Sequence, residues 1–128
     1  MMHKSLRLLA ICLAATTSVS AHHSTAVNFD FDVVVTIDGT VTEFRFQNPH
    51  VQILMDVRKD DGSSEIWMVE MAAKNQLVRG GWSGDEFAPG QVLSIDGFKG
   101  YRDRTAYFSV ATRADGTEVR APALITAR

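Results

Sequence analysis

The stretch that decides the fold is HVQILMDVRKDDGSSEIWMVEMAAKNQLVRGGW, from His50 to Trp82. Residues His50 to Val57 alternate between apolar and polar side chains, which predicts a strand with one buried face. The residues that share the predicted buried face are Val51, Ile53, Met55 and Val57. Leu54 is the exception on the polar face. The run Lys59-Asp60-Asp61-Gly62 then predicts a hairpin turn.

A second strand follows at about Glu65 to Met71, and then the pattern changes. Residues Ala72 to Trp82 include good helix formers and contain Gly80-Gly81 near their end. A glycine pair at this place is typical of a helix C-terminus. The stretch therefore predicts strand, hairpin, strand and short helix, in that order.

The flanking sequence adds strands on both sides. A long strand is predicted from Val33 to Phe46, with a bend or bulge at Gly39, and Asn48-Pro49 ends it. Beyond the helix, turn signals at short intervals separate further strands. These strands are Gln91 to Gly97 with Leu93 and Ile95 inward, Thr105 to Thr112 with Phe108 and Val110 inward, and a short one near Glu118 to Arg120.

Three strands, one helix and two or three further strands predict an all-β domain with one short helix. The order matches a small OB-like Greek-key β-barrel of five or six strands, with the helix between strands three and four. A generic six-stranded barrel or sandwich is the alternative. Neither fold specifies a function, because domains with these folds have many different functions.

The first residues predict a secretory signal peptide over residues 1–21, with an uncleaved anchor, or a cut one or two residues away, as the alternatives. Lys4 and Arg7 precede a short apolar run, and Val19 and Ala21 occupy a small-residue cleavage site. We expect Cys12 to leave with this segment, so no disulfide or thiolate site follows. The mature chain is then a single domain, residues 22–128, in the periplasm or outside the cell.

The charge and the absence of certain motifs argue against several classes of function. Without Lys4 and Arg7 the formal charge falls from -2 to -4, with 11 basic against 15 acidic residues. An acidic domain without a basic run is a poor candidate for nucleic-acid binding. The chain has no second apolar segment long enough to span a membrane, so we do not expect stable membrane insertion. No GxSxG, HExxH, CxxC or phosphate loop is present, which favours a non-enzyme.

Several short motifs together resemble a known family. They are AHHS (21–24), Phe29-Asp30, GTVTEFRFQNPH (39–50), IWMVE (66–70), RGGW (79–82), Pro89-Gly90 and IDGF (95–98). In this order they resemble DUF6152, a family of small exported bacterial proteins of unknown function. The chain departs from that pattern at Thr25, where an aromatic residue is common, and near Lys74, where a proline is. The resemblance implies an exported β-rich domain and no particular activity.

The predicted mature chain has three histidines, His22, His23 and His50. A free α-amine at His22 and its own Nδ1 can chelate one metal ion. One imidazole from His50 or His23 would complete a three-nitrogen set, a histidine brace. Planar nitrogen ligands suit Cu(II), so copper is the predicted metal and zinc the alternative. In the competing interpretation His22 and His23 lie in solvent, and His50 bonds within its turn.

Other side chains have ordinary interpretations beside functional ones. Glu70 is a candidate fourth ligand, or a carboxylate that orients a histidine. The methionines Met55, Met68 and Met71 are predicted as core fillers. The aspartates Asp60, Asp61 and Asp115 are predicted to stabilise turns.

Two functions follow from these residues. The first is a periplasmic copper-binding or copper-carrying protein that serves a periplasmic or membrane partner. The second is a metal-free binding module for a peptide, a glycan or a partner protein. Its groove residues would be Gln52, Trp67 and Tyr101, beside Leu54, and Tyr101 with Arg102 and Arg104 can meet an anion or a sugar. In the competing interpretation Trp67 and Trp82 pack under the helix.

Overall fold

The computed structural model describes residues 25–123. The strands are β1 (Phe29–Arg45), β2 (Gln52–Arg58), β3 (Ser64–Glu70), β4 (Val92–Gly100), β5 (Thr105–Arg113) and β6 (Glu118–Arg120). A 3₁₀ turn, η1 (Thr25–Val27), precedes β1, and the helix α1 (Lys74–Arg79) lies between β3 and β4. None of the helices described here is long and apolar enough to cross a membrane.

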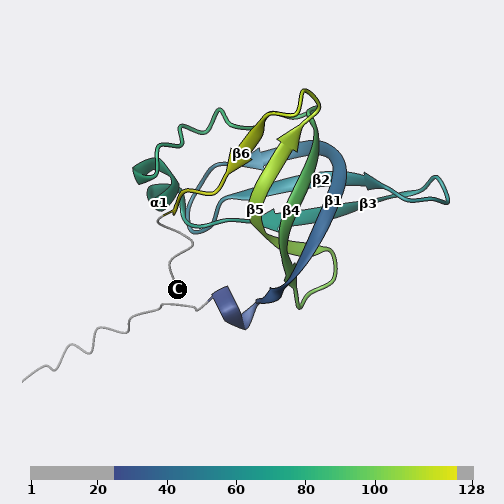
Figure 1. Ribbon diagram of the computed structural model, residues 1–128, viewed down its shortest axis with the longest axis horizontal. Coiled ribbons are helices and arrows are strands. Elements are labelled where there is room, and N and C mark those ends of the chain that lie inside the picture. The colour runs from purple at the N-terminus through teal and green to yellow at the C-terminus, as the bar shows by residue number, and fades with distance from the viewer. Residues whose placement is uncertain (1–24, 124–128) are drawn as a thin grey trace, which may run out of the picture.

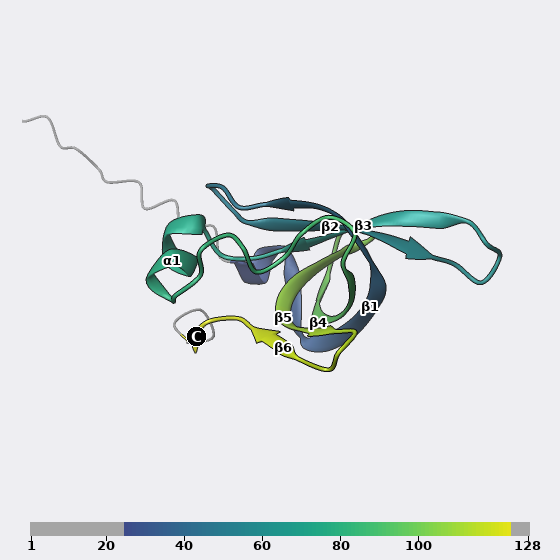
Figure 2. The same ribbon diagram turned by 90° about the horizontal axis from the view of Figure 1, so that it is seen from above.

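The six strands form one curled sheet, in the order β3-β2-β1-β4-β5-β6. Neighbouring strands in this order are antiparallel, and a parallel pairing of β3 with β5 closes the barrel. Figures 1 and 2 show the closed strands, with α1 on one side and the β2–β3 hairpin projecting from the other. The prediction of a small OB-like barrel with a helix between strands three and four is confirmed.

The long first strand can serve two neighbours because it curves around the barrel. Its first part pairs with β4 and its last part with β2. Gly39 was expected to bend or bulge, but the register breaks near it lie between Asp30 and Val34 and between Val41 and Glu43. Gly39 instead lets β1 approach the backbone of β2 closely, because a Cβ there would lie 2.6 Å from the carbonyl oxygen of Asp56.

The core confirms the predicted alternation: Val51, just before β2, and Ile53 and Met55 within it are fully buried, and Val57 is partly buried against the core. In β5 Phe108 is buried as predicted, but the inward prediction for Val110 is wrong. The register shifts opposite Asp96 and Gly97, so that one extra residue enters β5 after Phe108. This bulge changes the alternation and places Ala111 in the core instead.

Glycines end the elements where the sequence predicts turns. Gly62 and Gly90 adopt the left-handed φ values of +83° and +90° in their turns. The short helix lies within the predicted stretch Ala72 to Trp82 and ends at the predicted glycine pair, with Gly80 as its C-cap and Gly81 at φ +98°. The amide of Trp82 then donates to the carbonyl of Leu77 at 3.0 Å, so this carbonyl near the C-terminal end of α1 has a hydrogen-bond partner.

Candidate functional site

His50 stands at a fixed point of the barrel, between the Asn48–Pro49 turn and β2. The Asn48–Pro49 peptide bond is cis. Next to His50, the amide of Val51 donates to Ala72 at 3.1 Å, and the Val51 carbonyl accepts from Met71 at 2.8 Å. The side chain of Val51 is fully buried. The residue that follows His50 is therefore held to the chain after β3 by two backbone hydrogen bonds.

The imidazole of His50 contacts the carboxylate of Glu70, at the end of β3. The contact joins Nδ1 of His50 to Oε1 of Glu70. An ionised carboxylate can only accept a hydrogen bond, so Nδ1 carries the proton and a neutral ring keeps its lone pair on Nε2. The His50 side chain is 38% exposed and that of Glu70 is 14% exposed. The carboxylate is thus mostly covered, while the ring can be reached from solvent.

Glu70 has an aromatic neighbour across the barrel seam. In the parallel pairing of β3 with β5, Glu70 stands opposite Tyr107. Burial of the phenol, and then the charge of Glu70, raise the pKa of Tyr107 to about 12. The ring of Phe29 lies 5.3 Å from that of Tyr107, measured between centroids, and Phe31 lies 5.8 Å from it.

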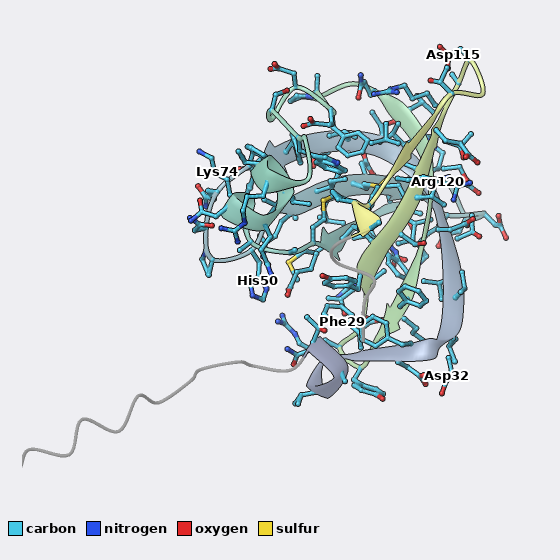
Figure 3. The ribbon with its side chains drawn as sticks, turned by 60° about the vertical axis from the view of Figure 1, so that its left-hand side comes forward. Phe29, Asp32, His50, Lys74, Asp115 and Arg120 are labelled. Carbon is cyan, nitrogen blue, oxygen red and sulfur yellow. The ribbon has the colours of Figure 1, made fainter. Side chains whose placement is uncertain are left out.

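These contacts bring the start of the described chain toward His50. Phe29 is only 3% exposed, so the packing anchors the first residue of β1. The amide of Tyr101 donates to the carbonyl of Asn28 at 2.9 Å, which fixes the residue before it. Figure 3 shows the His50 ring projecting outward, below Lys74 and on the side where Phe29 lies. His22 and His23 lie outside the described residues.

The three predicted groove residues separate into two places. Gln52 accepts a hydrogen bond of 3.5 Å from Arg45 and pairs through the backbone with Glu70. Trp67 and Tyr101 line a different pocket, under the loop between β4 and β5. Trp67 also packs against the core, whereas Trp82 belongs to the core itself. The structure therefore joins Trp67 with Tyr101 but not with Gln52.

The remaining candidates have structural roles. Met55 and Met71 are buried in the core, and Met68 is partly buried. Asp61 and Asp115 each accept hydrogen bonds from a backbone amide and a hydroxyl two residues later, and these bonds lower the pKa of both carboxyls. Within residues 25–123, no three His, Cys, Asp or Glu side chains gather into a metal-binding group.

Sequence reasoning missed two neighbours of these sites. Tyr107 adjoins Glu70 only because β3 and β5 pair, and that pairing is a property of the closed barrel. Lys99 joins Trp67 in the pocket for the same reason. An explicit barrel register, with strand three set beside strand five, would have found both.

Comparison with known proteins shows the family. A model of DUF6152, described as a family of unknown function, matches residues 10–107, and the chain belongs to this family. A search of curated proteins found no match. Among solved structures, the chain is similar to Rim1, a mitochondrial single-stranded DNA binding protein from S. cerevisiae, at 10% identity and a TM-score of 0.48. The similarity covers 64% of this chain and 93% of that one.

Proposed function

We propose that this member of the DUF6152 family is an exported protein that binds one copper ion through His22 and His50. Cleavage after Ala21 would give His22 a free α-amine, and His23 would lie beside it. The amine and Nδ1 of His22 supply two nitrogen donors, and His50 supplies the third. The protein would buffer copper or deliver it to a periplasmic or membrane partner.

The observation that carries this proposal is the contact between His50 Nδ1 and Glu70 Oε1. Histidines that bind metals commonly donate their other ring N–H to a carboxylate, which fixes the tautomer and raises the basicity of the ligand. His50 has this arrangement, and its ring is accessible. Glu70 then acts by orienting His50 rather than as a ligand.

The path of the chain supports a role for His22. The packing of Phe29 on Tyr107 anchors the chain beside the strand pair that carries Glu70. His22 stands three positions before Thr25, where the described part of the chain begins. Three residues reach at most about 10 Å. The anchored end of β1 thus limits how far the N-terminus can lie from the barrel.

The donor set favours copper. Amine and imidazole nitrogens suit Cu(II), which has the highest affinity among the divalent first-row metals. The α-amine has an ordinary pKa of about 7.7–8.0 and imidazole of about 6.5, so a metal can deprotonate both at neutral pH. Zinc can use the same imidazoles in a tetrahedral set, and competition between the two metals distinguishes them.

The experiment is a Cu(II) titration of the exported, processed protein, followed by calorimetry and EPR. We expect 1:1 binding, its loss in His50→Gln, and a 10- to 100-fold weaker affinity in Glu70→Gln. Gln52→Ala is the matched control, because Gln52 lies next along the same face of β2. Equal copper affinity in His50→Gln and in the native protein would contradict the proposal, and preferential binding of zinc would refute the choice of metal.

A further inference from the structure

A second site lies away from His50, in the pocket that Trp67 and Tyr101 share. Its volume is about 300 Å³, and it lies between β1, β3 and the loop that joins β4 to β5. This volume is at the lower end of the range for ligand pockets, so a small molecule fits it. The lining residues are Val35, Trp67, Lys99, Gly100, Tyr101, Arg102, Asp103, Arg104 and Thr105.

The pocket is basic, although the protein is acidic. Three lining residues are cationic and one is anionic, while the whole chain has a formal charge of -2. Arg104 pairs with Asp103 at 3.2 Å, an ion pair exposed to water. Glu65 lies near the pocket, where its carboxylate accepts from the indole N–H of Trp67 at 2.9 Å. The charge that remains favours an anionic ligand.

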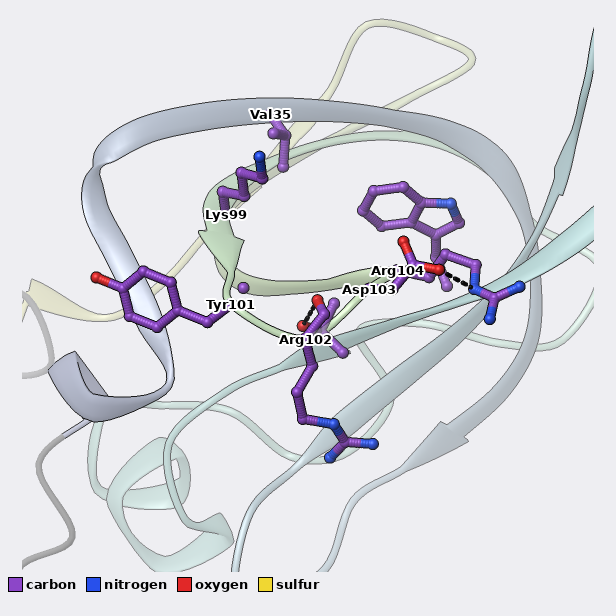
Figure 4. A pocket seen from close by; sticks show the side chains of 9 residues that line it. Val35, Lys99, Tyr101, Arg102, Asp103 and Arg104 are labelled. Carbon is purple, nitrogen blue, oxygen red and sulfur yellow. Dashed lines mark hydrogen bonds and ion pairs between the residues drawn. The ribbon is translucent and has the colours of Figure 1, made fainter.

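Among residues 25–123, the two pocket cations without an ion pair, Lys99 and Arg102, point in different directions (Figure 4). Figure 4 shows Lys99 extending toward Val35, whereas the guanidinium of Arg102 points the opposite way from the loop. No hydrogen bond or ion pair engages the side-chain nitrogens of Lys99 or Arg102 within the described part of the chain. Lys99 can therefore meet an anion inside the pocket, and Arg102 lies at its rim.

The apolar lining suits a flat ring. Val35 and the indole of Trp67 come from different strands, and Tyr101 is 67% exposed beside them. Aromatic faces bind planar rings by stacking, with a contribution beyond the buried area. A ring against Trp67, with its acid group toward Lys99, uses both kinds of surface.

The loop that forms the floor is fixed before any ligand binds. The hydroxyl of Thr105 donates to the carbonyl of Arg102 at 2.7 Å, and the amide of Met68 donates to Arg104 at 3.0 Å. Arg104 adopts a φ of +54°, which a side-chain-bearing residue rarely does. A constrained loop loses little entropy on binding, which favours a binding site over a surface irregularity.

We propose that this pocket binds a small organic anion that carries one flat ring, such as an aromatic carboxylate. The carboxylate would lie at Lys99 with Arg102 at the rim, and the ring would lie against Trp67. The site is independent of the copper proposal, because it shares no residue with His50 and Glu70.

The test uses 4-hydroxybenzoate as the probe, with 4-hydroxybenzyl alcohol and acetate as matched compounds that lack the charge or the ring. Binding is followed by amide chemical shifts in ¹H–¹⁵N spectra and by tryptophan fluorescence. Trp82 is buried in the core, so a fluorescence change should disappear in Trp67→Phe. We expect saturable shifts at residues 99–105 with the probe, and binding about fivefold weaker or more with either matched compound.

The variants are Lys99→Gln and, as a control, Arg58→Gln on the exposed hairpin. Lys99 is exposed, so its replacement should leave the fold intact. We expect Lys99→Gln to weaken binding of the probe about fivefold, and Arg58→Gln to leave it unchanged. The proposal is overturned if the probe gives no saturable shifts at residues 99–105. It is also overturned if the neutral alcohol or acetate binds equally well, or if Lys99→Gln binds like the native protein.

Discussion

Replacing Phe29 by alanine tests whether the aromatic contact at the start of β1 holds the N-terminal segment in place. Phe29 is 3% exposed and packs on Tyr107 at 5.3 Å. Phe→Ala in a core costs about 3–5 kcal/mol. Phe29 is the first residue of its strand, where the chain can partly collapse into the space, so we take about 3 kcal/mol.

The loss should appear first as local opening of the N-terminal segment. About 3 kcal/mol corresponds to a roughly 100-fold larger population of the detached segment. The amide of Tyr101, which donates to Asn28, should then exchange with solvent roughly 100-fold faster, measured by hydrogen exchange. The amide of Ile53, in a fully buried part of the barrel, should remain much slower to exchange than that of Tyr101, because it requires opening of the whole barrel.

Val34→Ala is the matched control, since Val34 lies in the same strand but is 61% exposed. Copper affinity should fall in Phe29→Ala and stay unchanged in Val34→Ala. Native exchange at Tyr101 in Phe29→Ala would refute the reasoning, because the ring would then not be what holds the segment.

Three further predictions concern the barrel. The pKa of Tyr107 is about 12 in the folded protein and 10.0 for the free side chain, so the unfolded chain loses this proton at a lower pH. The free energy of unfolding should therefore fall between pH 10 and 12, by at most about 2.7 kcal/mol. Tyr107→Phe should remove that part of the alkaline loss in urea unfolding, and an unaltered pH profile would argue against the burial of the phenol. Gly97→Ala should destabilise the protein by about 2 kcal/mol, because the new Cβ would lie 2.7 Å from the carbonyl oxygen of Tyr107; a native thermal midpoint would show that the strands can separate there. Ile53→Ala should cost about 2–5 kcal/mol in the same assay, since Ile53 is fully buried, and a loss below 1 kcal/mol would show a loosely packed core.

The sequence predicted those features of the fold that local chemistry determines. The alternation around Val51, Ile53 and Met55 requires one buried face, and the turns at Gly62 and Gly90 need left-handed backbone. The bulge in β5 could not be predicted in this way. An extra residue between Phe108 and Ala111 is specified by pairing with β4, which no local pattern records.

In the candidate sites, too, contacts within one hairpin could be predicted and contacts made by long-range strand pairing could not. His50 and Glu70 are 20 positions apart along the chain, and they meet because β2 and β3 form a hairpin with a predictable register. Tyr107 reaches Glu70 only through the closure of the barrel. The sequence therefore located the pair within one hairpin and missed the neighbour that a long-range pairing supplies.

The most direct test of the copper proposal compares two N-termini. The processed chain beginning at His22 is titrated with Cu(II) beside the same chain with one alanine added before His22, and both are examined by EPR. We predict tight 1:1 binding with a three-nitrogen signature in the first, and its loss in the second, where the chelating amine no longer belongs to a histidine. Equal binding in both chains would contradict the account, because the α-amine of His22 would then take no part in holding the metal.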